Sequence, residues 1–331
     1  MVAAPPRHGG DLAAAIATYG GRRGDWLDLS TGINPHAYPI PALPPEAWTH
    51  LPQGDAEAAL RGAAAGCYGV PDPACIVPAP GTQALIQWLA RLTAPGTVAV
   101  VGPTYGEHAA QWRLAGHTVR EVAEAGDHAQ AAVLIVVNPN NPDGRIVPRR
   151  DLLAIADRRA AHGRLTIVDE AFADVVPDAS IADAAGLPGL VILRSFGKVF
   201  GLAGLRLGFA LAPPAPAQRL REALGPWPVS GPALAIGALA LADARWIAAM
   251  RTQLAAEAAQ LDSVLAAAGL TIIGGTPLFR LIATAEAQAL HARLARRHIL
   301  TRPFDYRPDW LRLGLPGNTG RLGRLAEGLG S

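Results

Sequence analysis

Five short apolar runs, none of them alternating with polar residues, limit most strongly how this chain can fold. They occupy residues 97–101, 132–137, 165–168, 190–193 and 207–211. A strand that is apolar at nearly every position has both faces buried, which is typical of a parallel sheet covered by helices on both sides. Stretches with helical periodicity accompany these runs, at residues 83–92, 107–115 and 149–162. The succession of strand and helix therefore predicts an α/β fold with a mostly parallel central sheet.

The character of the chain changes after a cluster of prolines within residues 213–216. A long Ala-rich helix, two strands, a second helix and a last strand are predicted beyond it, at residues 245–268, 270–273, 279–282, 286–298 and 311–315. We therefore expect a large α/β domain over residues 46–214 and a smaller α+β domain over residues 215–331. Residues 1–45 are too few to fold alone and are expected to join the small domain.

Composition argues against several classes of protein. Of the 331 residues, 50% are apolar and 17% are charged, and 29 basic against 27 acidic residues leave a net charge of +2. No field that would attract nucleic acid or a membrane surface is expected from this balance. Cys67 and Cys75 lack the spacing of metal ligands, so no metal site is expected. The apolar stretch at 233–241 is shorter than the ~20 residues of a membrane span, and no signal peptide is recognisable, so we expect a cytoplasmic protein.

Lys198 is the first candidate for chemistry. It ends the sequence Ser195-Phe196-Gly197-Lys198, which follows a buried strand, and a glycine-rich segment continues from it to Arg206. An amine at the end of a buried strand is partly desolvated, which lowers its affinity for a proton and makes it a nucleophile. Lysine is scarce in this chain, which makes a chance placement less expected. A lone lysine in such a position is nevertheless more often structural, so the interpretation depends on its neighbours.

Three further side chains follow apolar runs in the same way. Asp169, Asn141 and Tyr105 each come just after a predicted strand. Because parallel strands end at a common edge of the sheet, where such folds bind ligands, we expect these side chains to lie near one another. Each also has an ordinary alternative: Asp169 as a helix cap, Asn141 as a turn residue and Tyr105 as a surface tyrosine.

A possible anion site precedes them in the chain. Pro80-Gly81-Thr82-Gln83 opens a helix after a short strand at 76–78. The free N–H groups and positive dipole end of a helix suit a phosphate, although a glycine before a helix is common. Individually these features are modest, but their shared order and their shared position at strand ends favour one ligand site.

The combined pattern resembles the fold-type I pyridoxal-phosphate enzymes, the aspartate-aminotransferase-like superfamily. The turn Asn141-Pro142-Asp143-Gly144 is similar to the superfamily's Asn-Pro-Thr-Gly, and Asp169-Glu170-Ala171-Phe172 is similar to its Asp-Glu-Ala-Tyr. The segment from Ser195 to Arg206 resembles its Schiff-base lysine loop with a phosphate-binding arginine. Arg312, in Leu311-Arg312-Leu313-Gly314, resembles the arginine that grips the substrate α-carboxylate. The resemblance extends from about residue 25 to the C-terminus.

The resemblance implies a cofactor, pyridoxal 5'-phosphate, carried as a Schiff base on Lys198. Asp169 would pair with the ring nitrogen, Asn141 with the phenolic oxygen, and Tyr105 would stack on the ring. The cofactor phosphate would be held by residues from three segments, namely Gly81, Thr82, Gln83, Ser195 and Arg206. A homodimer is expected by analogy.

The N-terminal segment narrows the resemblance. His8-Gly9-Gly10-Asp11 and the segment from Leu29 to Asn34-Pro35 are similar to the threonine-phosphate decarboxylases of cobalamin biosynthesis, which are related to histidinol-phosphate aminotransferase. This implies decarboxylation of O-phospho-L-threonine to (R)-1-amino-2-propanol phosphate, with His8, Gly9 and Asn34 binding the substrate phosphate. Two alternatives stay open: an aminotransferase for a phosphorylated amino acid such as histidinol phosphate, and a non-catalytic scaffold in cobalamin assembly.

Two residues depart from the superfamily pattern. Phe172 stands in place of a tyrosine whose hydroxyl often contacts the phenolic oxygen of the cofactor. Leu51, in His50-Leu51-Pro52, stands where many relatives have a tyrosine that reaches the cofactor phosphate of the neighbouring subunit. Both changes remove a hydrogen-bond donor, and they imply a lower cofactor affinity or a compensating donor elsewhere.

Overall fold

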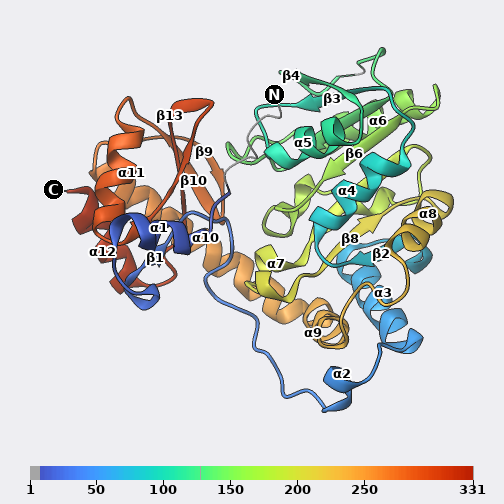
Figure 1. The fold of residues 1–331 in the computed structure, drawn as a ribbon, viewed down its shortest axis with the longest axis horizontal. Coiled ribbons are helices and arrows are strands. Elements are labelled where there is room, and N and C mark those ends of the chain that lie inside the picture. Colours follow the sequence, from blue (N-terminus) through green and yellow to red (C-terminus); the bar gives the residue numbers. More distant parts are fainter. Residues whose placement is uncertain (1–7, 127, 331) are drawn as a thin grey trace. The chain divides into compact units, whose positions relative to one another are not determined.

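The computed structural model describes residues 8–126 and 128–330 (Figure 1). These residues form two compact units. The larger unit comprises residues 37–141 and 146–247; the smaller unit combines the described residues before Ala37 with residues 142–145 and those from Ala248 onward. The sequence-based domain limits at residues 45 and 214 stay predictions, because a compact unit is not by itself an independently folding domain.

A seven-stranded sheet forms the centre of the larger unit, with the strand order β2-β8-β7-β6-β5-β3-β4. Its strands are β2 Ile76–Ala79, β3 Thr97–Val101, β4 Thr118–Val122, β5 Val133–Val137, β6 Leu165–Asp169, β7 Leu190–Ser195 and β8 Gly208–Leu211. The neighbouring strands from β7 to β4 are parallel, and β8 runs antiparallel to both of its neighbours, β7 and β2. All five apolar runs are strands of this sheet, which confirms the predicted α/β fold.

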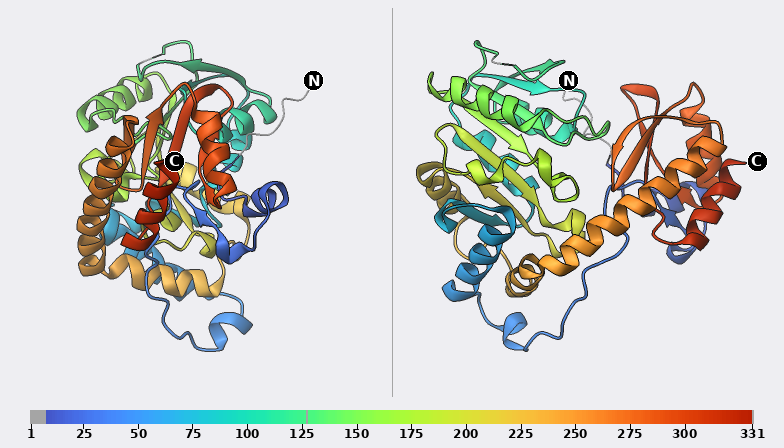
Figure 2. Two further views of the ribbon diagram at one scale, coloured as in Figure 1. Left: turned by 90° about the vertical axis from the view of Figure 1, so that its left-hand side faces the viewer. Right: turned by 180° about the vertical axis from the view of Figure 1, so that it is seen from behind.

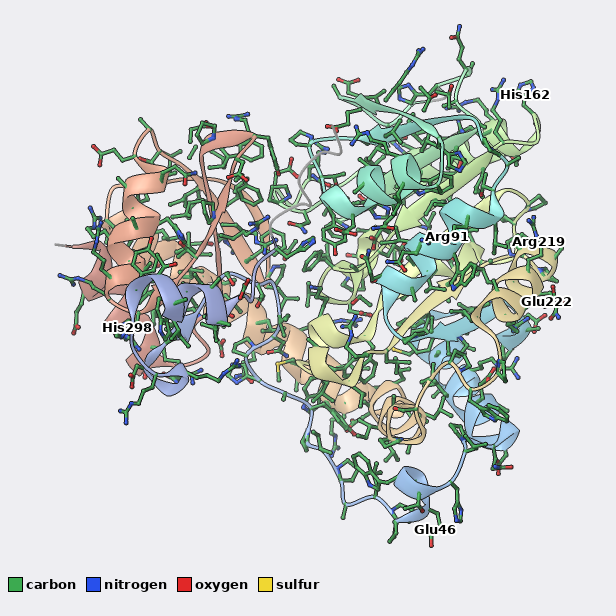
Figure 3. All side chains as sticks on the ribbon, viewed as in Figure 1. Glu46, Arg91, His162, Arg219, Glu222 and His298 are labelled. Carbon is green, nitrogen blue, oxygen red and sulfur yellow. The ribbon has the colours of Figure 1, made fainter. Side chains whose placement is uncertain are left out.

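Helices cover both faces of the sheet. The described α-helices of this unit are α2 Glu46–Thr49, α3 Gly54–Tyr68, α4 Thr82–Leu92, α5 Gly106–Leu114, α6 Arg149–Ala160, α7 Phe196–Val199, α8 Pro214–Leu224 and α9 Gly231–Ala242. One core contains side chains of α4, α5 and α8 together with every second residue of the strands beneath them. Figures 1 and 2 show α6 on the opposite face. Arg219 of α8 donates to the carbonyl oxygen of Leu92 at 2.6 Å, which joins α8 to the end of α4 (Figure 3).

Several elements were absent from the sequence-based interpretation, and two cases in the larger unit have a clear description. The edge strand β4 was one, because most of its residues are half-buried or exposed and it therefore lacks a continuous apolar signal. The helices α3 and α9, which pack on each other, were the other. Among the described residues, no single helix is both long and apolar enough to cross a membrane. The helices α9 and α10 (Ala244–Ala267), which are joined at a bend of 76°, satisfy this criterion only when taken as a pair, and only by length and composition.

A four-stranded antiparallel sheet, with the order β12-β13-β10-β9, forms the smaller unit together with helices. Its strands are β9 Thr271–Thr276, β10 Phe279–Ala283, β12 Arg302–Phe304 and β13 Arg307–Gly314. Three described helices lie wholly in this unit, α1 Leu12–Tyr19, α11 Ala287–Arg296 and α12 Thr319–Leu329, and most of α10 belongs to it. Gly269 has φ +72° just after α10, as expected for a glycine that ends a helix.

The N-terminal segment of the smaller unit is tied to residues that lie far along the chain. Strand β1 (Leu27–Asp28) pairs in parallel with β11 (Ile299–Leu300). The backbone N–H of Gly314 at the end of β13 donates to the carbonyl oxygen of Leu29 at 2.7 Å. The segment that carries His8 and Asn34 and the strand that carries Arg312 are therefore parts of one framework.

Candidate active site

A small pocket of about 130 Å³ in the larger unit collects seven of the residues singled out in the sequence. They are Gly81, Thr82, Gln83, Tyr105, Ser195, Lys198 and Arg206. They come from the start of α4, the start of α5 and the segment after β7, so the ends of several parallel strands do converge there.

Glycines shape the pocket by permitting close approaches of backbone and side chain. Gly81, with φ +87°, caps α4, and a Cβ on it would lie 2.7 Å from Nη2 of Arg206. A Cβ on Gly208 would lie 2.7 Å from the backbone nitrogen of Thr82. Arg206 itself adopts the left-handed conformation, which is uncommon for a residue with a side chain. Gly81 thus lies next to both the first turn of the 11-residue helix α4 and the guanidinium group of Arg206. A helix N-terminus beside a guanidinium group suits a phosphate.

Lys198 is the only lysine among the 331 residues of the chain. It lies in α7, a four-residue helix that follows β7 directly, and it is half-buried. Its Nζ lies 5.4 Å from the centroid of the Phe172 ring. Any reaction that needs a side-chain amine of this protein must therefore take place at this residue.

Asp169 and His108 form a buried pair at the ends of β6 and α5. Their side chains are 4% and 1% exposed, and Nε2 of His108 lies 2.8 Å from Oδ2 of Asp169. The other carboxylate oxygen of Asp169 accepts the backbone N–H of Ala171 at 3.0 Å. The pair fixes the orientation of the carboxylate that the resemblance assigns to the ring nitrogen. His108 was missed in the sequence, where its position three residues after Tyr105, on the same face of a helix, was the available signal.

Tyr105 precedes α5, and its ring meets the ring of His108 edge-on, with centroids 6.1 Å apart. Burial raises the pKa of Tyr105 to about 12; the carboxylates of Glu107 and Asp169 add to this shift and Arg206 opposes it. The phenol donates to Oε1 of Gln83 at 3.4 Å, and Nε2 of Gln83 donates to the Glu107 carboxylate at 2.6 Å. The Gln83 side chain therefore supports Tyr105, a contact that the sequence did not indicate.

Asn141 lies at the end of a braced loop after β5. Its neighbour Asn140 accepts the Thr104 hydroxyl at 2.6 Å and donates to the carbonyl oxygen of Pro103 at 3.0 Å. Asn138 accepts the backbone N–H of Val147 at 2.8 Å, across the same loop. These bonds hold the loop that presents Asn141, which is half-buried.

A buried ion network lies next to the strand ends that carry Asp169 and Ser195. Arg194, the residue before Ser195, donates to the carboxylate of Glu170 at 2.6 Å and also pairs with Asp174. Burial opposes the charge of Arg194, but the two carboxylates outweigh burial and raise its pKa. Since Glu170 directly follows Asp169, this network ties together the two strand ends that carry Asp169 and Ser195.

The N-terminal candidates lie in the smaller unit. His8 and Gly9 line a pocket of about 470 Å³, together with Ser30 and Arg302. The Gly10 N–H donates to the Ser30 hydroxyl at 2.7 Å, and a Cβ on Gly9 would lie 2.2 Å from the carbonyl oxygen of Ser30. Only glycine therefore fits at residue 9 without movement of the segment.

Asn34 is buried in the same unit, at 2% exposure. Its Oδ1 accepts the backbone N–H of His36 at 2.8 Å, which closes a local turn. The carbonyl of this side chain is thus used within the chain, and its proposed contact with a substrate phosphate stays a prediction.

Arg312 is a buried cation on β13, at 6% exposure. Its Nη2 donates to the carbonyl oxygen of Ser30 at 2.8 Å, and its guanidinium carbon lies 5.2 Å from the centroid of the Phe279 ring. Arg302 on β12 stands directly opposite Arg312 on β13 in the antiparallel pair, so both side chains project from the same face of the sheet. Burial, together with the charge of Arg302, lowers the pKa of Arg312 to about 10. Two neighbouring cations on one face favour an anionic ligand; Arg302 was not identified in the sequence.

Comparison with known proteins places these observations in a family. The family model described as aminotransferase class I and II matches residues 26–329. A threonine-phosphate decarboxylase of Sinorhizobium sp is 49% identical, covering 99% of this chain and 98% of the relative, and one of Pseudomonas aeruginosa is 45% identical, covering 97% and 96%. Histidinol-phosphate aminotransferase 1 of Thiobacillus denitrificans is 30% identical, covering 78% and 72%.

Solved structures share the fold at low sequence identity. Histidinol-phosphate aminotransferase of Sinorhizobium meliloti, solved with pyridoxal-5'-phosphate, has a TM-score of 0.82 at 21% identity and covers 96% of this chain and 93% of that one. L-threonine-O-3-phosphate decarboxylase of Porphyromonas gingivalis has a TM-score of 0.76 at 19% identity and covers 91% and 97%. These structures confirm the predicted fold class, with its mostly parallel sheet and smaller antiparallel sheet.

Proposed function

This chain belongs to the aminotransferase class I and II family, and from that premise we propose that it is a threonine-phosphate decarboxylase. The reaction removes CO₂ from O-phospho-L-threonine and leaves (R)-1-amino-2-propanol phosphate, for cobalamin biosynthesis. The observation that carries this proposal is the near-complete coverage, at 49% and 45% identity, of two relatives with that name. The aminotransferase relative, at 30% identity, covers less of the chain.

The cofactor of the family is pyridoxal phosphate, and the pocket around Lys198 fits it. The chain offers a single side-chain amine there, and the absence of a side chain at Gly81 lets the Arg206 guanidinium come close to the start of α4. When bound, the cofactor supplies an acceptor for the electron pair released at the substrate Cα. We assign the cofactor phosphate to Arg206, Ser195 and the residues that open α4, which are Gly81, Thr82 and Gln83.

Tyr105, which lines the pocket, and Asp169 and Asn141, which do not line it, would orient the cofactor ring in this proposal. Asp169 holds a proton at the ring nitrogen, and His108 fixes the carboxylate in place at 2.8 Å. Tyr105, which stays protonated at neutral pH, stacks on the ring. Asn141 donates to the phenolic oxygen.

The smaller unit offers cations for the two anionic groups of the substrate. We assign the substrate carboxylate to Arg312 and the substrate phosphate to the pocket that contains His8, Gly9 and Arg302. By fixing the carboxylate and the phosphate, these residues would orient the substrate and so select which bond at Cα breaks. Lys198 then adds a proton at Cα.

The main alternative is an aminotransferase for a phosphorylated amino acid such as histidinol phosphate. Purified protein with pyridoxal phosphate and O-phosphothreonine should release CO₂ in step with aminopropanol phosphate, without any keto acid. Turnover that depends on a keto acid, without CO₂, would instead establish the aminotransferase. A protein that binds no cofactor and gives no borohydride-stable adduct at Lys198 would support a non-catalytic scaffold.

We also propose that the protein is a cytoplasmic homodimer. Exposed apolar side chains of the larger unit, Ile40, Trp48 and Leu51, are 62%, 68% and 58% exposed. Ile40 and Trp48 line an apolar pocket of about 680 Å³ together with four residues that follow Lys198, namely Gly201, Leu202, Gly204 and Leu205. Such a surface is unusual on a monomer and suits a second copy of the chain. Sedimentation equilibrium of the wild type and of Trp48→Glu should show a dimer that the variant weakens.

A further inference from the structure

Ser30 lies where the two proposed anion sites of the smaller unit meet. The residue is 2% exposed, and it lines the pocket that contains His8 and Arg302. Its carbonyl oxygen accepts a hydrogen bond from Nη2 of Arg312 at 2.8 Å, and its hydroxyl oxygen accepts the backbone N–H of Gly10 at 2.7 Å. One residue therefore contacts both the arginine assigned to the substrate carboxylate and the segment assigned to the substrate phosphate.

Asp28 holds Ser30 in a single orientation. Oδ1 of Asp28 accepts the backbone N–H of Ser30 at 2.8 Å and the Ser30 hydroxyl at 2.5 Å. Because that hydroxyl donates its proton to the carboxylate, its oxygen meets the Gly10 N–H as an acceptor. The donor and acceptor functions of the Ser30 side chain are thus both used within this framework, and the side chain cannot rotate without breaking these bonds.

Gly9 allows the N-terminal segment to approach Ser30 closely. A Cβ on Gly9 would lie 2.2 Å from the carbonyl oxygen of Ser30 and 2.8 Å from its carbonyl carbon, which is far inside a normal contact. The carbonyl group that Gly9 approaches is the same one that accepts Arg312. The separation between the segment of residues 8–10 and the Arg312 guanidinium is therefore set by packed backbone atoms and by buried hydrogen bonds.

A fixed separation between two anion sites selects ligands by the length of chain between their anionic groups. In O-phosphothreonine, Cα, Cβ and the ester oxygen separate the carboxylate carbon from the phosphorus, and O-phosphoserine has the same spacing. O-phosphohomoserine has an additional methylene group between them. A ligand with matching spacing engages both sites at once, because its second group binds at a high effective concentration. A longer ligand must bend or displace one of the sites, which lowers its affinity.

We propose that Ser30 is a positioning residue that fixes the separation between the carboxylate site at Arg312 and the phosphate site at His8 and Gly9. It thereby restricts the substrate to α-amino acids that carry their phosphate on an oxygen at Cβ. Its hydroxyl acts through the Gly10 N–H and its carbonyl oxygen acts through Arg312. This inference rests on the proposed decarboxylase function and names the substrate class of that site.

The first test compares ligands that differ in spacing. O-phospho-L-serine and O-phospho-L-homoserine compete with O-phospho-L-threonine in the cofactor-loaded enzyme, and the ratio of their inhibition constants isolates the additional methylene group. The wild type should bind the serine compound more tightly. Ser30→Ala removes the hydrogen bond to Gly10 and should reduce this preference about 2- to 10-fold, which corresponds to the loss of one neutral hydrogen bond.

Two further variants support this comparison. Gly9→Ala displaces the Ser30 carbonyl oxygen and should also reduce the preference, so the test survives if Ser30→Ala folds poorly. Thr284→Val is the matched control, because it removes another hydroxyl of the smaller unit that accepts a backbone N–H, that of Glu286 at 3.3 Å. This control should keep the preference of the wild type.

The second test separates the two sites by calorimetric titration of the cofactor-loaded enzyme. L-threonine carries only the carboxylate, and aminopropanol phosphate carries only the phosphate. Ser30→Ala should raise the Kd of aminopropanol phosphate about 2- to 10-fold and leave the Kd of L-threonine unchanged, because the backbone carbonyl that holds Arg312 is retained. In a His8→Ala background the effect of Ser30→Ala on aminopropanol phosphate should become smaller, since it acts through the same segment.

Two results would overturn the inference. One is an unchanged preference between the two phosphorylated ligands in both Ser30→Ala and Gly9→Ala. The other is an equal loss of affinity for L-threonine and aminopropanol phosphate in Ser30→Ala, which indicates general loosening of the unit. A wild type that releases no CO₂ from O-phospho-L-threonine would refute the proposed function instead, and the calorimetric titration would still decide whether Ser30 positions the phosphate site.

Discussion

Replacing Gly81 with alanine separates two effects of a single methyl group at the proposed phosphate site. Gly81 has φ +87° and ψ 160°, a region that essentially only glycine occupies, so alanine there costs about 1–3 kcal/mol of stability. This strain is present with and without cofactor, so it lowers the free energy of unfolding but leaves the cofactor affinity unchanged. The added Cβ would also lie 2.7 Å from Nη2 of Arg206, which must move away.

The movement of Arg206 is what should change the affinity. A hydrogen bond to a charged group contributes about 1.5–3 kcal/mol, so a displaced guanidinium should raise the Kd for pyridoxal phosphate roughly 10- to 100-fold. Titration of the cofactor-free protein, followed by absorbance, measures the Kd, and urea unfolding measures the stability. Two alanine variants separate the effects. Gly116 also has a positive φ, but a Cβ added there would have no atom within 4 Å, so Gly116→Ala brings backbone strain without a steric contact. Gly204, close to Arg206 in the chain, has neither a positive φ nor an atom within 4 Å of an added Cβ, so Gly204→Ala brings neither effect.

Gly116→Ala should therefore lose stability without losing affinity, and Gly204→Ala should resemble the wild type in both measurements. If Gly81→Ala binds pyridoxal phosphate as tightly as Gly116→Ala does, the assignment of the cofactor phosphate to the Gly81–Arg206 site is wrong. If Gly204→Ala also bound pyridoxal phosphate more weakly, any substitution near Arg206 would lower the cofactor affinity. The weaker binding of Gly81→Ala could then not be attributed to contact between its Cβ and Arg206.

Three further predictions concern other parts of the larger unit. Borohydride reduction of the loaded enzyme should label one lysine peptide, and Lys198→Ala should abolish the adduct; a label elsewhere in the wild type would contradict the assignment. Arg194→Met breaks a buried ion pair and should cost about 3–5 kcal/mol in urea unfolding, whereas Arg149→Met, whose pair with Asp183 is exposed, should cost about 1 kcal/mol or less. Burial raises the pKa of Tyr105 to about 12 from an ordinary value of 10.0, so the unfolded phenol ionises first. The free energy of unfolding should therefore fall as the pH rises from 10 to 12, and it should fall less steeply in Tyr105→Phe than in the wild type. Equal slopes in urea unfolding of the two proteins over this range would refute this.

The sequence by itself determined most strands of the central sheet and the chain order of the main candidate residues. A strand buried on both faces must be apolar at nearly every position, so β3, β5, β6, β7 and β8 could be located from local composition. Parallel strands end at one edge, so residues that follow such strands could be expected to meet. The pocket that contains Tyr105, Ser195 and Lys198 bears out the expectation of proximity for these three residues, whereas Asp169 and Asn141 are not among the residues that line it. The chemical roles of all of them stay predictions.

The tertiary structure alone decided the contacts that join distant parts of the chain. His108 lies 61 residues from Asp169, and only the fold of the larger unit brings the start of α5 and the end of β6 together, with Nε2 of His108 2.8 Å from Oδ2 of Asp169. Arg302 faces the same side as Arg312 because of the register between β12 and β13, and a shift by one residue would turn it to the other face. The ring of Phe172 next to Lys198 is likewise a product of how β6 and β7 pair. Local sequence patterns indicate which residues are buried and where turns occur. They do not indicate which buried surfaces contact each other, because those contacts depend on the packing of the whole unit.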